Sequence, residues 1–139
     1  MPSVLRPLLI VLALLLPSAA AAHQEMLEGS EWGVVGDTET AGRFISFAGQ
    51  NRVFGFTGCN RFTGTFEQHD EHLTISPLAT TKMACMGEGQ AREAEFLDVL
   101  GKVRGAKVDH TLLLLLDDKG RDLKTLIRRG TPAPAEEQQ

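Results

Sequence analysis

Short apolar segments separated by turn-forming residues run through most of the chain, and they restrict it to a β-rich fold. Segments of four to six residues rich in Val, Ile, Leu, Phe and Thr alternate with clusters of Gly, Asp and Asn. A repeat of roughly 8–12 residues between such segments favours an antiparallel sandwich or barrel. The predicted strands are Glu31–Val35, Arg43–Phe47, Arg52–Thr57, Phe62–Glu67, His72–Pro77, Lys107–His110, Thr111–Leu116 and Leu123–Arg128.

Two of these regions carry information about which faces are buried. One set of residues shares a single parity, which predicts that they form one buried face. Its members are Phe54, Phe56, Phe62, Gly64 and Phe66. The run Leu112–Leu116 has no alternation, so it suits either a central strand covered on both faces or a barrel strand packed on a helix.

Residues 89–103, GQAREAEFLDVLGKV, depart from the strand pattern. Ala94, Leu97 and Leu100 recur at three-residue spacing, which predicts an amphipathic helix. Acids cluster early, at Glu88, Glu93 and Glu95, and bases lie late, at Lys102 and Arg104, as the helix dipole favours. The predicted fold class is therefore mainly β (β-rich α+β), a small antiparallel β-barrel-like domain with one inserted α-helix near residues 89–103. Whether the barrel is open or closed is not determined by the pattern.

The N-terminal 22 residues have the layout of a secretory signal peptide. Arg6 precedes the apolar run Leu8–Leu16, and the small residues Ala20 and Ala22 follow, as an A-x-A cleavage site requires. Nine apolar residues are too few for a stable membrane-spanning helix, although a short membrane anchor is the alternative. We expect cleavage after Ala22 and a periplasmic or secreted protein without a membrane span.

The remainder of the chain is long enough for one domain with its own core. Without residues 1–22, which carry one basic residue and no acid, 117 residues remain, and 13 Lys and Arg face 18 Asp and Glu for a formal net charge of −5. An acidic surface argues against nucleic acid as a partner. We expect a domain over residues 26–129, a disordered tail over 130–139 because of its prolines and lack of large apolar groups, and a monomer.

The chain has two cysteines, Cys59 and Cys85. In an oxidising compartment a lone pair of cysteines is usually crosslinked, so we predict a disulfide. In the chain-entropy model it would stabilise the fold by about 3.5 kcal/mol. A free nucleophile or a metal ligand is the alternative role for Cys59.

Other residues with potential chemistry form no recognisable site. His69 and His72 lie near three acids and could in principle bind zinc; the acids are Glu67, Asp70 and Glu71. Side chains three apart on an extended chain point to opposite faces, which favours a solvated turn. The sequence has no G-x-S-x-G elbow and no phosphate-binding glycine motif before a helix. We therefore expect no enzyme activity, no cofactor and no specific metal.

The segment GCNRFTGTF, residues 58–66, reads as architectural. Gly58 and Gly64 permit bulges or tight bends in a curved strand. Asn60 tolerates a left-handed conformation and can bond its own backbone. Arg61 is expected to lie over the sheet or to pair with an acid such as Glu93.

This segment also carries a family resemblance. GCNRFTGTF, the T-x-M-A-C sequence at residues 81–85 and E-x-x-F-L-x-x-L at 93–100 together resemble the META domain (HslJ-like, DUF306) family. The resemblance implies a small β-barrel-like fold with one helix and no catalytic residues. It assigns structural roles to Trp32, Gly58, Asn60, Phe62, Gly64, Thr81 and Met83.

The family resemblance also sets the functional expectation. The family that the sequence resembles includes bacterial envelope proteins, some of them heat-inducible and loosely linked to antibiotic tolerance. We expect an exported, non-enzymatic protein that supports envelope stress tolerance by binding an envelope protein or a small apolar ligand. An inhibitor-like module that acts on an envelope enzyme is the alternative, and an enzyme with an unrecognised site is a further one.

Overall fold

The computed structural model describes residues 26–130, which contain nine strands and one helix. The predicted signal peptide and, apart from Gly130, the predicted disordered tail lie outside the described residues. Each of the eight predicted strands is present, and the structure adds a two-residue strand, β6, that was not predicted. The elements are β1 (Ser30–Val34), β2 (Phe44–Ala48), β3 (Arg52–Phe56), β4 (Arg61–His69), β5 (His72–Ile75), β6 (Ala79–Thr80), α1 (Glu88–Lys102), β7 (Gly105–Asp109), β8 (Leu112–Leu116) and β9 (Asp122–Arg128).

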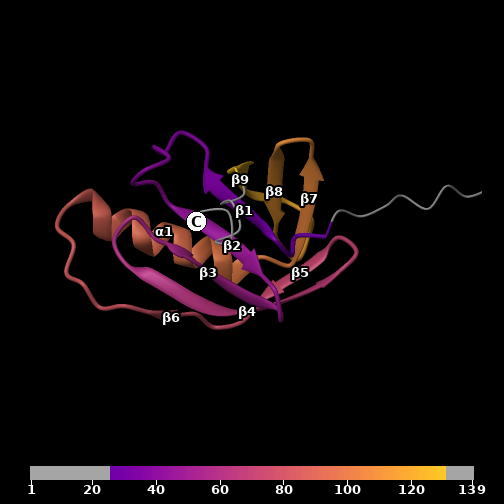
Figure 1. Ribbon diagram of the computed structural model, residues 1–139, viewed down its shortest axis with the longest axis horizontal. Helices are drawn as coiled ribbons and strands as arrows, with labels where there is room; N and C mark the ends of the chain where they lie inside the picture. Colours follow the sequence, from indigo (N-terminus) through magenta and orange to yellow (C-terminus); the bar gives the residue numbers. More distant parts are fainter. Residues whose placement is uncertain (1–25, 131–139) are drawn as a thin grey trace, which may run out of the picture.

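The strands form one antiparallel sheet that curls into a ring (Figure 1). Their order is β3-β2-β1-β9-β8-β7-β5-β4-β6, and an additional pairing of β3 with β4 joins the two ends. One seam of the ring is weak, because β5 pairs with β7 only through His72 and Gly105. The predicted β-rich class is confirmed. Every strand of the ring is paired with its neighbours, but β5 and β7 are paired over only one register position.

The core fills the interior of the ring and is closed by α1. Trp32, Phe47 and Phe62 are fully buried. The helix adds Phe96, whose ring meets that of Phe62 edge-on at 6.1 Å between centroids, and Leu100. Such contacts combine apolar burial with a favourable aromatic geometry. The helix begins and ends one residue before the predicted range. Within residues 26–130, no helix is long and apolar enough to span a bilayer.

The predicted buried face is wrong for β3. Phe54 is 44% exposed, whereas Val53 and Gly55 are buried. In the β3–β4 pair, Gly55 lies opposite Phe62 and Val53 lies opposite Gly64. Residues opposite each other in a ladder lie on the same face of the sheet. The odd-numbered residues of β3 therefore share a face with the even-numbered residues of β4, so the even-numbered residues of the two strands do not form one buried face.

The leucine run has one core face. Leu113, Leu115 and Leu116 are buried, while Leu112 and Leu114 are half-buried. An irregular register between Leu115 and Leu116 places two successive side chains inward, as a β-bulge does. The strand is therefore covered fully on one face and partly on the other.

Candidate functional site

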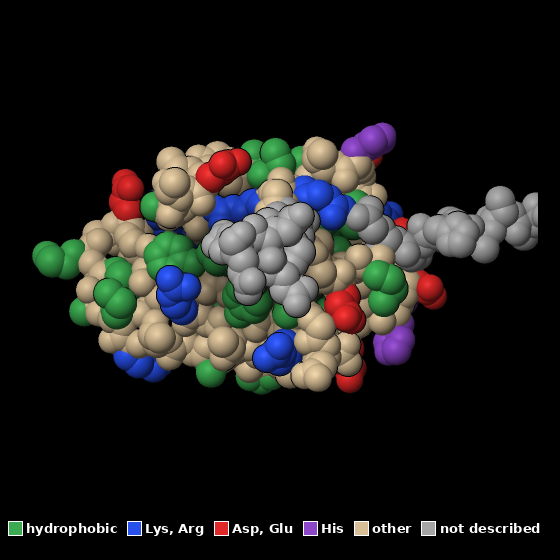
Figure 2. Space-filling model, viewed as in Figure 1, with side chains coloured by type: hydrophobic (Ala, Val, Ile, Leu, Met, Phe, Trp, Pro, Cys, Tyr) green, Lys and Arg blue, Asp and Glu red, His purple; other side chains and the backbone are tan. Residues whose placement is uncertain are grey.

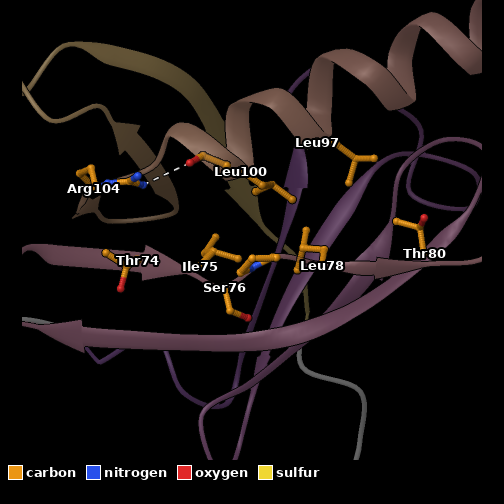
Figure 3. A pocket seen from close by; sticks show the side chains of 10 residues that line it. Thr74, Ile75, Ser76, Leu78, Thr80, Leu97, Leu100 and Arg104 are labelled. Atoms are coloured by element: carbon orange, nitrogen blue, oxygen red, sulfur yellow. Dashed lines mark hydrogen bonds between the residues drawn. The ribbon is translucent and has the colours of Figure 1, made fainter.

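A groove of about 560 Å³ lies between α1 and the β5–β6 segment (Figure 3). We call it the α1–β5 groove. Leu97 and Leu100 project from the helix toward Ile75 and Leu78 on the opposite wall, and Arg104 lies at the β5 end. Its lining residues are Thr74, Ile75, Ser76, Pro77, Leu78, Thr80, Leu97, Leu100, Gly101 and Arg104. This volume lies within the range of ordinary small-molecule sites.

The groove exists because the sheet is interrupted here. Past His72, β5 diverges from β7, and α1 rather than another strand lies on the far side of the groove from β5. Leu78 approaches the sheet closely at Gly64, where an added Cβ would lie only 2.7 Å from Leu78 Cδ2. The register of β4 against β3 is continuous at Gly64, so the expected bulge is not present there. The glycine instead permits the close approach of Leu78, which forms part of one wall of the groove.

The lining of the groove combines apolar side chains with three hydroxyl groups and one guanidinium. None of its residues is an acid, a histidine or a cysteine, and Arg104 is its one charged residue. Arg104 Nη1 donates to the carbonyls of Gly101 (3.1 Å) and Val103 (2.6 Å), and so caps the end of α1. Ser76 Oγ accepts from the Thr65 amide at 2.9 Å, and no general base lies among the lining residues to activate it.

A buried polar cluster fixes α1 on the sheet. The Asn60 side-chain amide donates to Glu93 Oε2 (3.0 Å), Glu93 Oε1 (3.2 Å) and the Met83 carbonyl (3.2 Å). Asn60 Oδ1 accepts from the Met83 amide (2.7 Å) and Thr81 Oγ1 (2.9 Å). Thr57 Oγ1 also donates to Glu93. One asparagine thereby joins β4, the loop after β6 and the first turns of the helix.

The disulfide reinforces the same junction. Cys59 and Cys85 lie at disulfide distance, with Cα atoms 5.8 Å apart, within the range that a bridge permits. Gly58 has φ 93°, so its left-handed turn favours glycine as predicted. Asn60, however, has no positive φ: its side chain bonds the loop after β6, and the expected left-handed conformation is wrong.

The expected Arg61–Glu93 ion pair is absent from the described residues. Glu93 accepts instead from Thr57 and Asn60, and Arg61 is exposed. The burial of Asn60 explains this difference, because an amide already satisfies the carboxylate without the desolvation of a second charge.

A second charged cluster links the β1–β2 loop to α1. Arg43 contacts Asp37 at 2.9 Å and Glu95 at 2.5 Å, and Arg92 contacts Asp37 at 2.7 Å. Hydrogen bonds from the Arg43 side chain, aided by its backbone amide and by Arg92, hold the pKa of Asp37 well below its usual range, against the opposing effect of burial. This cluster is a structural clamp on the far side of the helix from the groove's lining residues.

The predicted geometry of the histidine segment is wrong. His69 and His72 pair directly across the β4–β5 hairpin, so their side chains share a face because a two-residue turn folds the chain between them. Figure 2 shows histidine side chains exposed at one end of the molecule. Within residues 26–130, no group of three His, Cys, Asp or Glu side chains is arranged to hold a metal ion.

Residues of the family motif contribute to the fold in two ways, either through a buried side chain or through the backbone alone. Trp32 is fully buried, and its indole donates to Ser30 Oγ at 2.7 Å while Arg128 stacks on the ring at 4.3 Å. Met83 contributes only its backbone to the Asn60 cluster, because its side chain is 68% exposed.

The META domain family model matches residues 25–129, which include every strand, the helix and the Asn60 cluster. The chain belongs to the META domain family. No curated protein matches it.

Solved structures agree with the META fold. An NMR structure of a protein from Burkholderia xenovorans is 25% identical, with a TM-score of 0.61 over 74% of this chain and 83% of that one. A crystal structure of a DUF4847 family protein from Bacteroides vulgatus ATCC 8482 is 17% identical, with a TM-score of 0.54 over 80% and 98% of the two chains. At 17% identity, the similarity to the DUF4847 structure shows a shared fold and nothing further.

The residues that line the groove of this META domain were not predicted as a site from the sequence. Leu78, Leu97 and Arg104 gave no signal of a shared site, because they are far apart in the chain and come from a loop, a helix and the residue before β7. One indication was available: Pro77 ends the regular strand pattern before β6, which marks an interrupted sheet edge.

Proposed function

We propose that this protein is an exported, non-catalytic binding domain that holds an apolar ligand, or an apolar segment of a protein partner, in the α1–β5 groove. It would thereby support tolerance of envelope stress. The observation that carries the proposal is a groove of about 560 Å³ with apolar walls and a single cation at one end. The barrel interior is filled by side chains, so this groove is a better candidate than the core.

One feature supports binding rather than catalysis, and two others support export from the cytoplasm. The lining residues include no acid, histidine or cysteine that would act as a general base. The Cys59–Cys85 bridge is compatible with an oxidising compartment. The N-terminal segment has the signal-peptide layout given above.

The test uses anilinonaphthalene sulfonate, an anionic fluorophore that reports apolar binding sites. We expect saturable binding to the wild-type protein and a loss of at least tenfold in affinity for Leu97→Asn, which puts an amide into the apolar wall. Val35→Asn is the matched control, because Val35 is 53% exposed and is not among the lining residues. Equal binding by all three proteins would contradict the proposal.

The stress role needs a test in cells. A deletion strain that expresses the Leu97→Asn variant in place of the wild-type protein should recover from heat shock as poorly as the deletion strain itself. A strain that carries Val35→Asn should recover as well as the wild type. Full recovery with Leu97→Asn would separate the groove from any stress function.

A second candidate rests on the loop between β6 and α1, which Figure 1 shows running along one side of the molecule to the start of the helix. Met83 and Met86 on this loop are 68% and 95% exposed, and the loop is held by the disulfide and by Asn60. A rigid loop with exposed apolar tips suits an inhibitor-like module. Capture of one envelope enzyme that Met83→Ser/Met86→Ser abolishes and Leu97→Asn leaves unchanged would favour this candidate.

A further inference from the structure

The β5–β6 edge presents backbone groups to the groove that no strand pairs. Leu73 donates its amide to the Arg104 carbonyl at 3.1 Å, away from β4, whereas Ser76 donates to the Thr65 carbonyl at 2.9 Å, toward β4. Successive residues of a strand direct their backbone groups to alternate sides. The amide and carbonyl of Ile75 therefore point the same way as those of Leu73, into the groove, where β7 has already diverged.

The same alternation holds on β6. Thr81 donates its amide to the Arg61 carbonyl at 3.0 Å, so Thr80, the residue before it, directs its amide and carbonyl away from β4. In the part of the chain that the structure describes, β6 pairs only with β4. Apart from their register positions opposite Phe66 and Phe62 of β4, neither Ile75 nor Thr80 is paired with another strand there, although Ile75 is only 9% exposed. Unpaired polar groups at a half-covered edge are costly and readily accept a further strand.

The opposite wall fits the side chains of such a strand. Leu97 faces the edge across the groove (Figure 3) and is half-buried, so an added strand would place a side chain on it. Leu100, which is fully buried, supports this wall from behind. Arg104 keeps Nε and Nη2 without a hydrogen-bond partner among the described residues, since only Nη1 is used to cap α1. A carboxylate on the added segment would find a charge-assisted partner there.

We propose that the α1–β5 groove binds an extended peptide segment, which adds as a strand to Ile75 and Thr80, packs apolar side chains on Leu97 and places a carboxylate at Arg104. This inference rests on the proposed function and names its partner class. Strand addition draws affinity from backbone hydrogen bonds and specificity from alternate side-chain pockets. An apolar small molecule would use the walls of the groove but not its edge.

The experiment starts from a random twelve-residue peptide library displayed on phage, selected on the full domain. Selected peptides are made synthetically and titrated by NMR. We expect the amide hydrogens of Ile75 and Thr80 to become at least tenfold more protected from exchange, and the amides of Thr74 and Ala79 to change less. Selected peptides that leave Ile75 and Thr80 unprotected, or a library that gives no binder, would overturn the inference.

A variant gives an independent readout. Thr80→Pro removes one outward amide while proline remains acceptable at a sheet edge. It should weaken peptide binding at least tenfold relative to Thr80→Val, which changes the side chain but keeps the amide. If Thr80→Pro does not fold, the selected peptide is modified instead, by N-methylation of either its odd-numbered or its even-numbered amides. Methylation of the set that faces the β5–β6 edge should abolish binding, and methylation of the other set should not. If both sets bind alike while the fluorophore still needs Leu97, strand addition fails and the groove function stands.

Discussion

Asn60 and Glu93 meet in the interior, where the asparagine amide contacts both carboxylate oxygens at 3.0 and 3.2 Å. Asn60 is 3% exposed, and its other side-chain bonds reach the loop after β6. This pair attaches the first turns of α1 to the residue that precedes β4.

Asn60→Asp should destabilise the protein strongly at neutral pH, by about 2–4 kcal/mol. The substitution keeps the shape but sets a second carboxylate against Glu93, and two close carboxylates cannot both ionise without cost. Chemical denaturation at pH 7 measures the loss. The double variant Asn60→Asp/Glu93→Gln should recover at least half of it, because an amide again faces a carboxylate. A double variant no more stable than Asn60→Asp would refute the assigned pairing.

Loss of the Cys59–Cys85 bridge should lower stability by about 2–5 kcal/mol, the usual range for small secreted domains. For a domain of this size the melting temperature should fall by roughly 10 °C or more. Cys59→Ser, Cys85→Ser and the double variant should be nearly equal, because all three lose the same bond. Thermal melts with and without reductant provide the measurement. A wild-type melt that reductant does not change, with unequal single variants, would restore a free-thiol role.

Asp37→Asn should alter the acid limb of the stability profile. The pKa of Asp37 in the folded state lies well below its ordinary value of 3.8, so the unfolded state takes up the proton first as the pH falls. Its contribution is therefore complete above about pH 5 and is lost as the solution becomes more acidic. Wild-type stability should fall more between pH 6 and pH 2.5 than that of Asp37→Asn.

At pH 7, Asp37→Asn should cost about 2 kcal/mol, since hydrogen bonds to a charged group are lost. Asp98→Asn is the control: Asp98 pairs with Lys102 at 2.7 Å, but both side chains are about 60% exposed, and such pairs contribute little. Parallel pH profiles for wild type and Asp37→Asn would contradict the prediction.

Oxidation of the surface methionines should leave the fold intact. Met26, Met83 and Met86 are all at least 62% exposed, so hydrogen peroxide should convert them to sulfoxides without unfolding. Mass spectrometry counts the sulfoxides, and we expect the melting temperature to shift by less than about 2 °C. Met83→Ala should be similarly neutral, because the Asn60 cluster uses only the backbone of Met83. A large loss of stability in either case would show that this side chain has a structural role.

The sequence predicted local patterns better than relations between distant segments. Strand positions, the helix and the Cys59–Cys85 pairing followed from periodicity, spacing and the expected compartment. The buried face of β3 did not, because the facing side chains are set by the register of Gly55 against Phe62. Of the two alternatives for Arg61, the pairing with Glu93 rested on charge alone, whereas the structure gives Glu93 to the buried Asn60 and to Thr57. The groove depends on where β5 leaves β7, which no single segment encodes.

The role of the α1–β5 groove is tested most directly by an NMR titration of the isotope-labelled protein with anilinonaphthalene sulfonate. We predict that the largest amide shift changes fall on residues 74–80 and 97–104, the two walls of the groove, and that Leu97→Asn removes them. Shift changes centred instead on the exposed Phe54 or Ile127, or unchanged by Leu97→Asn, would contradict the account.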